Sequence, residues 1–294
     1  MSMLISKTTN NITGSTLNPY NRTLQAGGAS GGEGALLALR GSPFGWAADI
    51  AGSIRIPAAF NNLWGVRTSS GRISATGLAN SLPGLPTAGS VVGPMCADLP
   101  SLKYMMEWYL SCRTWEEDHK VIDLPWRESA YNGTLTEMCH YGQRDGRLVF
   151  AVLASDEEVY PHPPVQRAMQ IVTEALLQRG YEVIKWQPPS HQIGTQTLFR
   201  VLGASAGKPV KDAVHASGEP HIPQLADLFS KQVDALSTPE FWELCQRKDK
   251  YVEDYHKYSK STSQLTKSGR AVDGVILPVA AHTAAPEGMF KHYA

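Results

Sequence analysis

The stretch RLVFAVLASDEEVYPHPPVQRAMQIVTEALLQRGYEVIKW, residues 147–186, decides the fold class. Residues 147–155 are an apolar run of strand length, and residues 181–186 are a second one. Between them, residues 163–180 place Val165, Ala168, Met169, Val172 and Leu176 at helical spacing, and Gly180 is a helix-ending signal. Strand, helix and strand within about forty residues form a βαβ unit, which places parallel strands in an α/β sheet.

The flanking sequence continues this mixed pattern. We predict a helix over residues 99–113, with Leu102, Met105 and Leu110 on its buried face, and a long amphipathic helix over residues 237–260. Residues 271–282 read as a last buried strand, and residues 61–98 as short extended pieces broken by Gly, Pro and Ser. No internal repeat divides the chain, so we predict a single domain over residues 1–294.

Composition excludes several classes of function. The 294 residues carry 27 basic and 27 acidic side chains, so we expect no binding to nucleic acid. We expect no membrane span, because no apolar run of about 18 residues is present. Four scattered cysteines read as reduced thiols, which predicts a cytoplasmic protein. The nine histidines form no ligand motif, so no metal and no cofactor are predicted.

A glycine-rich segment, residues 26–60, is the strongest candidate for a functional site. Eight glycines lie between Ala26 and Ser53, although each costs about 0.5–1 kcal/mol against alanine in a regular element. Two small-residue loops, 26–34 and 47–53, are the parts that require a bare backbone. The first leads into an apolar run, residues 35–39, that we expect to be helical.

Two interpretations of these loops remain open from the residues alone. In the first, Ser53 is a nucleophile, and the backbone N–H groups of the four residues before it converge on a developing negative charge, because acyl transfer needs a nucleophile and two or more donors around one carbonyl. The alternative is a site of tight backbone packing without chemistry. Residues 203–209 imitate a phosphate loop but have Pro209 after Lys208, so we predict an ordinary turn between helices there.

The sequence GGASGGEGALLALRGSPFGWAADIAGSIRIP resembles the amidase signature family, and within it the fungal acetamidase-like branch. The family form is G-G-S-S-G-G-E-G-A, then a spacer of the same length, then G-T-D-I-G-G-S-I-R-x-P. The resemblance extends over nearly all of the chain and implies an α/β fold, a mixed and largely parallel sheet covered by helices on both faces. It also implies an amidase, a hydrolase of linear amide C–N bonds, with a small-molecule amide as substrate; a homodimer is left open.

The resemblance also assigns roles to residues. Ser53 maps to the acyl-forming nucleophile, and the backbone of Ile50, Ala51, Gly52 and Ser53 to the oxyanion hole. The bridging serine of the family's Ser–Ser–Lys triad maps to Ala29, and the candidate substitutes are the neighbouring Ser30 and a water molecule.

The remaining part of the triad departs from the family pattern. Lys7 is the lone lysine before Ser53, and it does not match the segment that supplies the family's catalytic lysine. We therefore expect an incomplete signature fold, truncated at both ends, with weak or no turnover. The alternative functions are a non-catalytic amidase-like remnant and a binding protein.

Overall fold

A computed structural model describes residues 7–139, 148–223, 225–226 and 234–289. These residues fall into two compact units. Unit 1 contains residues 1–126, 201–237 and 284–294, and unit 2 contains residues 127–200 and 238–283. The single domain over residues 1–294 stays a prediction.

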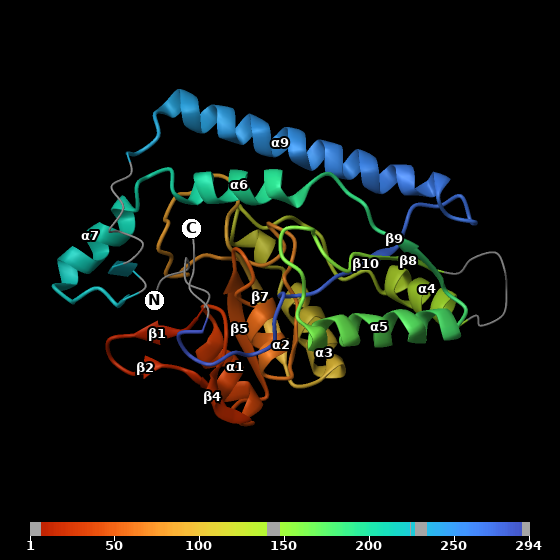
Figure 1. Ribbon diagram of the computed structural model, residues 1–294, viewed down its shortest axis with the longest axis horizontal. Coiled ribbons are helices and arrows are strands. Elements are labelled where there is room, and N and C mark those ends of the chain that lie inside the picture. The colour runs from red at the N-terminus through yellow and green to blue at the C-terminus, as the bar shows by residue number, and fades with distance from the viewer. Residues whose placement is uncertain (1–6, 140–147, 224, 227–233, 290–294) are drawn as a thin grey trace. The chain divides into compact units, whose positions relative to one another are not determined.

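Figure 1 shows helices and strands mixed along the described part of the chain, which begins with the short strands β1 to β4. The strands are β1 Thr9–Asn10, β2 Gly14–Ser15, β3 Leu17–Asn18, β4 Asn21–Gln25, β5 Phe44–Asp49, β6 Trp64–Gly65, β7 Val91–Cys96, β8 Val149–Val152, β9 Glu182–Lys185 and β10 Gly274–Ile276. The helices are α1 Gly31–Ala38, α2 Arg55–Phe60, α3 Leu99–Ser111, α4 Glu128–Cys139, α5 Pro163–Gln178, α6 His191–Leu202, α7 Lys208–Ser217 and α9 Thr238–Ser261, with 3-10 turns η1 Thr114–Glu116 and η2 Thr262–Gln264.

Unit 2 contains the predicted βαβ unit. Strands β8 and β9 are parallel and α5 joins them; β10 pairs with the other edge of β8, also in parallel. Val149 and Ala151 of β8 are buried, whereas Phe150 and Val152 are half-buried, because alternate residues of a strand face opposite sides of a sheet. The predicted last strand is shorter than expected, since the extended segment ends at Ile276, two residues before Pro278.

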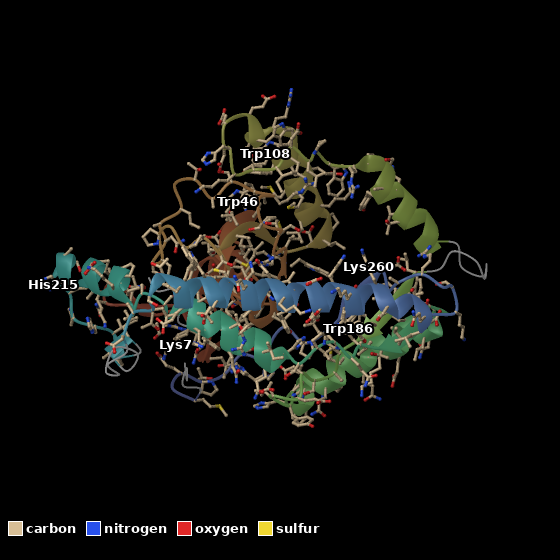
Figure 2. The ribbon with its side chains drawn as sticks, turned by 90° about the horizontal axis from the view of Figure 1, so that it is seen from above. Lys7, Trp46, Trp108, Trp186, His215 and Lys260 are labelled. Carbon is tan, nitrogen blue, oxygen red and sulfur yellow. The ribbon has the colours of Figure 1, made fainter. Side chains whose placement is uncertain are left out.

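The long helix α9 packs through aromatic side chains onto the end of β9. Trp186, which is labelled in Figure 2, donates from Nε1 to the Tyr255 hydroxyl at 3.0 Å. The Trp186 ring meets the ring of Tyr258 edge-on, with 4.8 Å between the ring centroids. Gly194 of α6 lies against Tyr251, where a Cβ atom would come within 2.8 Å of the Tyr251 ring. These contacts explain why Trp186 is 2% exposed although it follows a short strand.

Unit 1 is built around an antiparallel sheet of order β5–β7–β6. Helices α1 and α2 cover this sheet, and their apolar side chains join it in a buried cluster of Leu37, Ala47, Ile54, Ala58 and Met95. The predicted helix over residues 99–113 is confirmed as α3, with Leu102, Met105 and Leu110 buried. Asp98 caps α3, because its carboxylate accepts the Ser101 N–H at 2.8 Å.

The mixed α/β class is therefore confirmed. Parallel and antiparallel strand pairs lie in different sheets. The parallel pairing lies in the β10–β8–β9 sheet, whereas the strand pairs around the glycine-rich segment are antiparallel. The phosphate-loop imitation over residues 203–207 is a turn between α6 and α7, as predicted.

Candidate active site

Both glycine-rich loops end at the start of a helix. Residues 26–30 lead from β4 into α1, and residues 50–54 lead from β5 into α2. Gly27, Gly28 and Gly52 have φ angles of +82°, +60° and +134°. Side chains are strained in this left-handed region, so the local chain path itself requires glycine at these positions.

Gly28 has a second reason to lack a side chain. A Cβ atom there would lie 2.8 Å from Cδ of Pro57 and 3.2 Å from Cα of Ser53. The two loops, 25 residues apart in sequence, thus touch backbone to backbone at the predicted nucleophile. This close approach explains why the sequence keeps the backbone bare.

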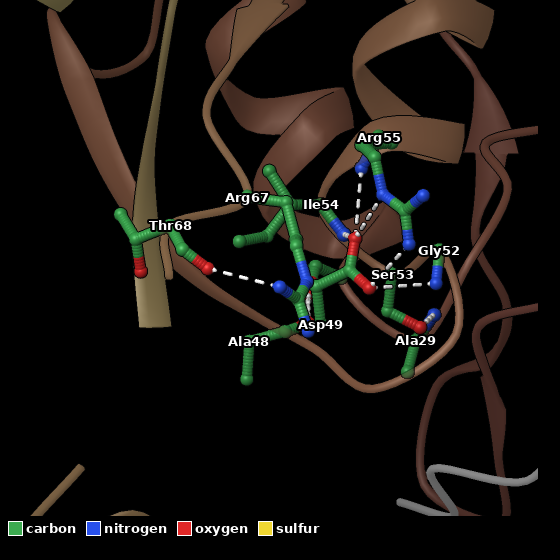
Figure 3. A network of polar contacts seen from close by, with 10 residues as sticks. Ala29, Ala48, Asp49, Gly52, Ser53, Ile54, Arg55, Arg67 and Thr68 are labelled. Carbon is green, nitrogen blue, oxygen red and sulfur yellow. Dashed lines mark hydrogen bonds and ion pairs between the residues drawn. The ribbon is translucent and has the colours of Figure 1, made fainter. Parts of the chain in front are cut away.

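The approach places Ser53 against the loop that carries Ala29. The Ala29 N–H donates to Oγ of Ser53 at 3.1 Å (Figure 3). A backbone donor at this distance fixes the rotamer of the serine and favours negative charge on its oxygen. The structure thus brings together two residues that the resemblance assigned to one site.

Asp49 holds the turn that presents Ser53. Its fully buried carboxylate accepts the N–H of Gly52 at 2.7 Å and the N–H of Ile54 at 3.1 Å, which lie on either side of Ser53. The Arg55 guanidinium binds the same carboxylate in a bidentate pair, with Nε and Nη2 each at 2.9 Å (Figure 3).

These contacts decide the charge of Asp49. Burial raises the pKa of its carboxyl, but the hydrogen bonds and charge of Arg55 and the N–H groups of Gly52 and Ile54 outweigh burial and lower the pKa below its usual range. Asp49 is therefore ionised at neutral pH. Because both of its oxygens are engaged by the turn, it acts as a structural anchor for Ser53.

The contacts of Asp49 also show which of the predicted oxyanion donors already has a hydrogen-bond acceptor. The Gly52 N–H is committed to the carboxylate, and it is not available to a bound oxyanion. The N–H groups of Ile50, Ala51 and Ser53 make no hydrogen bond to any described residue. They are the donors that this turn can offer to a carbonyl oxygen.

Ser30, the other candidate hydroxyl, is directed elsewhere. It is the residue before α1, and its Oγ donates to the carbonyl of Ala48 at 3.4 Å, a long contact. No hydrogen bond joins it to Ser53 within the described part of the chain. Its role as a proton relay stays a prediction without a contact that supports it.

Sequence reasoning missed Thr8, which lies in the polar segment before the glycine loop. Its Oγ1 donates to the carbonyl of Gly28 at 2.8 Å and accepts the Gly31 N–H at 2.8 Å. One hydroxyl thus closes the loop on both sides of Ala29. No local pattern marks a threonine that acts on residues twenty positions away, so only the tertiary structure reveals it.

Among the described residues no carboxylate, imidazole or amine is hydrogen-bonded to the Ser53 hydroxyl. Lys7 has a side chain that is 11% exposed, but its Nζ pairs with the carboxylate of Glu287 at 3.6 Å. Glu33 lies in the first turn of α1, and burial raises the pKa of its carboxyl. Within the described part of the chain, the Ser53 hydroxyl is thus oriented by a backbone N–H and has no hydrogen bond to a basic side chain.

The described residues also bear on metal binding and on membrane insertion. They contain no group of three or more His, Cys, Asp or Glu side chains placed to hold a metal ion. No helix in the same part of the chain combines the length and apolar character that crossing a membrane requires.

Comparison with known proteins gives a consistent result. The amidase family model matches residues 1–294. An acetamidase of Aspergillus oryzae is 36% identical over 291 residues, which cover 99% of this chain and 52% of that protein. An acetamidase of Emericella nidulans is 35% identical, again over 99% of this chain and 52% of that protein. This chain spans about half the length of these relatives.

Solved structures agree with the sequence relatives. A fatty acid amide hydrolase superimposes with a TM-score of 0.83 at 28% identity, covering 97% of this chain and 47% of that one. A second amidase structure superimposes with a TM-score of 0.69 at 23% identity, covering 96% of this chain and 55% of that one. The latter likeness concerns the fold alone.

Proposed function

Because this chain belongs to the amidase family, we propose that it acts on a small-molecule carboxylic amide, with Ser53 as the acyl-forming nucleophile. The products are a carboxylic acid and ammonia or an amine. The hydrogen bond from the Ala29 N–H to the Ser53 hydroxyl is the single observation that carries this proposal, because it supports a serine held in a fixed orientation next to a backbone donor.

The chemistry proceeds in two steps. Oγ of Ser53 attacks the amide carbon, the C–N bond breaks, and the serine proton leaves with the amine. Water then attacks the acyl-enzyme, which releases the acid and returns the proton to Ser53. In both steps negative charge develops on the carbonyl oxygen, where N–H groups of residues such as Ile50 and Ala51 are suited to receive it.

The same geometry predicts slow turnover for this chain. Each step needs a group that carries the proton, and a positioned acid or base contributes about 10²–10⁴-fold. Ala29 has no hydroxyl where the resemblance places the bridging serine, and no described base bonds to Ser53. Oxyanion donors and binding alone supply about 10³–10⁴-fold over water.

A fluorophosphonate probe tests the nucleophile directly, because it labels an activated serine without needing a complete amide turnover. We expect covalent labelling of the wild-type protein at Ser53, identified by peptide mass spectrometry. Ser53→Ala removes the label, and the matched control Ser70→Ala, at an exposed serine outside the candidate site, keeps it. Labelling that persists in Ser53→Ala refutes the assignment.

The second candidate function is a non-catalytic amidase-like protein that binds an amide. The presence of Ala29 in place of a relay hydroxyl is the observation that favours it. The variant Ala29→Ser separates the two candidates, because its new hydroxyl lies next to Ser53. For an enzyme that lacks its relay, we expect the labelling rate to rise about tenfold or more. A non-catalytic protein shows no increase.

We also propose a cytoplasmic location, which the free thiols of Cys96, Cys112 and Cys245 support. Fractionation of the source cells tests it. The homodimer stays a prediction, and light scattering on the purified protein measures it directly.

A further inference from the structure

Unit 1 contains a cavity whose lining residues include none from the turn that carries Ser53. Its volume is about 480 Å³, within the range of about 300–1,000 Å³ that small-molecule sites occupy. Three parts of the chain form it: the β1–β2 hairpin, the loop 79–83, and helix α7 with the segment that follows it. None of the proposed catalytic residues lines this cavity.

One wall of the cavity is apolar because of the pattern of α7. Val210, Ala213 and Val214 recur at helical spacing, so they share one face of the helix, and all three line the cavity. Val210 is buried together with Ile222 and Leu225, which line the cavity from the next segment. This wall offers an aliphatic surface to a ligand.

Glu219 also lines the cavity and supplies a charged group, in contrast to the apolar wall. Its carboxylate accepts from Nδ2 of Asn11 at 2.8 Å and from the Ser217 hydroxyl at 3.1 Å. Hydrogen bonds from Asn11 and Ser217 lower the pKa of the Glu219 carboxyl, so the group is ionised at neutral pH. A carboxylate has about four acceptor positions, and these two bonds leave the others for a donor in the cavity.

Asn11 also holds the segment that carries Glu219 in place. The same Nδ2 group donates to the carbonyl of Pro220 at 2.8 Å, so the hairpin is tied to the segment after α7 across more than 200 residues of sequence. Ser81 in the loop wall has a buried hydroxyl that bonds to no described atom.

We propose that this cavity binds a primary alkylammonium ion, with the ammonium group on Glu219 and the alkyl chain along the α7 wall. The ionised carboxylate attracts a cationic donor and repels an anion. Burial of an alkyl chain of several carbons against the aliphatic wall makes the binding free energy more favourable. The inference does not depend on catalysis at Ser53, because it concerns binding at a different set of residues.

Calorimetric titration of the full chain with hexylamine at pH 7.5 tests the proposal. We expect saturable binding with one site, and at least tenfold weaker binding of hexanol, which has the same chain without the charge. Glu219→Gln keeps the shape and removes the charge, so it weakens hexylamine binding about tenfold or more. The matched control Glu117→Gln removes an exposed carboxylate elsewhere in unit 1 and leaves the dissociation constant unchanged.

Ala213→Trp decides whether the cavity itself is the site. Ala213 is exposed on α7, so a larger side chain fills the cavity without entering the core, and circular dichroism verifies that the variant folds. We expect this variant to lose hexylamine binding, whereas Ser53→Ala retains it. Three results overturn the proposal: no saturable binding by the wild type, equal affinity for hexanol and hexylamine, or unchanged binding in folded Ala213→Trp.

Discussion

Replacing Asp49 with alanine tests whether one carboxylate holds the serine turn. The change leaves the N–H groups of Gly52 and Ile54 without their acceptor, and Asp49 is completely buried, so water does not replace it. Each buried donor without a partner costs about 1–3 kcal/mol, which gives about 4 kcal/mol for two. The Arg55 side chain is 43% exposed and regains contact with water, so we assign it little of the cost.

The matched control is Asp98→Ala. Asp98 is also an aspartate that accepts backbone N–H, but it caps α3 at the surface, where loss of a cap costs about 1 kcal/mol. Urea denaturation followed by tryptophan fluorescence measures both free energies of unfolding. Hydrogen exchange over residues 44–65 then shows whether the loss is confined to the serine turn.

The free energy of unfolding should also depend on pH through Asp49, which provides a second test. The pKa of Asp49 is lowered in the folded chain, so its stabilisation is present above the unfolded pKa of about 3.9 and is lost as pH falls through the folded value. The difference between wild type and Asp49→Ala should therefore shrink below about pH 4. The reasoning is refuted if Asp49→Ala costs no more than Asp98→Ala at pH 7.

Further predictions concern the glycine loop and the aromatic contact of α9. Gly28→Ala should destabilise the protein by about 2–4 kcal/mol in urea denaturation, because its φ is positive and its Cβ meets the α2 proline. Gly32→Ala, at a helical position with open space around it, should instead stabilise by about 0.5–1 kcal/mol. Thr8→Val should cost about 2 kcal/mol and slow fluorophosphonate labelling, since it removes the hydroxyl that closes the loop; rescue by Thr8→Ser distinguishes the hydroxyl from side-chain volume. Trp186→Phe should cost about 1 kcal/mol in thermal unfolding, because it removes the hydrogen bond from Trp186 Nε1 to the Tyr255 hydroxyl, and no change in melting temperature would contradict this.

Much of the fold was predictable because the relevant signals are local. The helical spacing of Val165, Met169 and Val172 predicted α5, and the apolar runs beside it predicted β8 and β9. Periodicity reports which face of an element is apolar, and it does so without knowledge of partners. It does not report pairing, so the antiparallel partnership of β5 with β7, more than forty residues apart, came from the structure.

From residue types at fixed spacing, the sequence predicted the family of this chain, which is confirmed, and the nucleophile Ser53, which stays a prediction. It also showed that the backbone between Ala26 and Ser53 must be bare. Only the tertiary structure decided what the bareness serves, the contact of Gly28 with Ser53, and that Asp49 takes the Gly52 N–H. Hydrogen bonds between distant segments, such as those of Thr8, depend on the path of the whole chain, which no local pattern encodes.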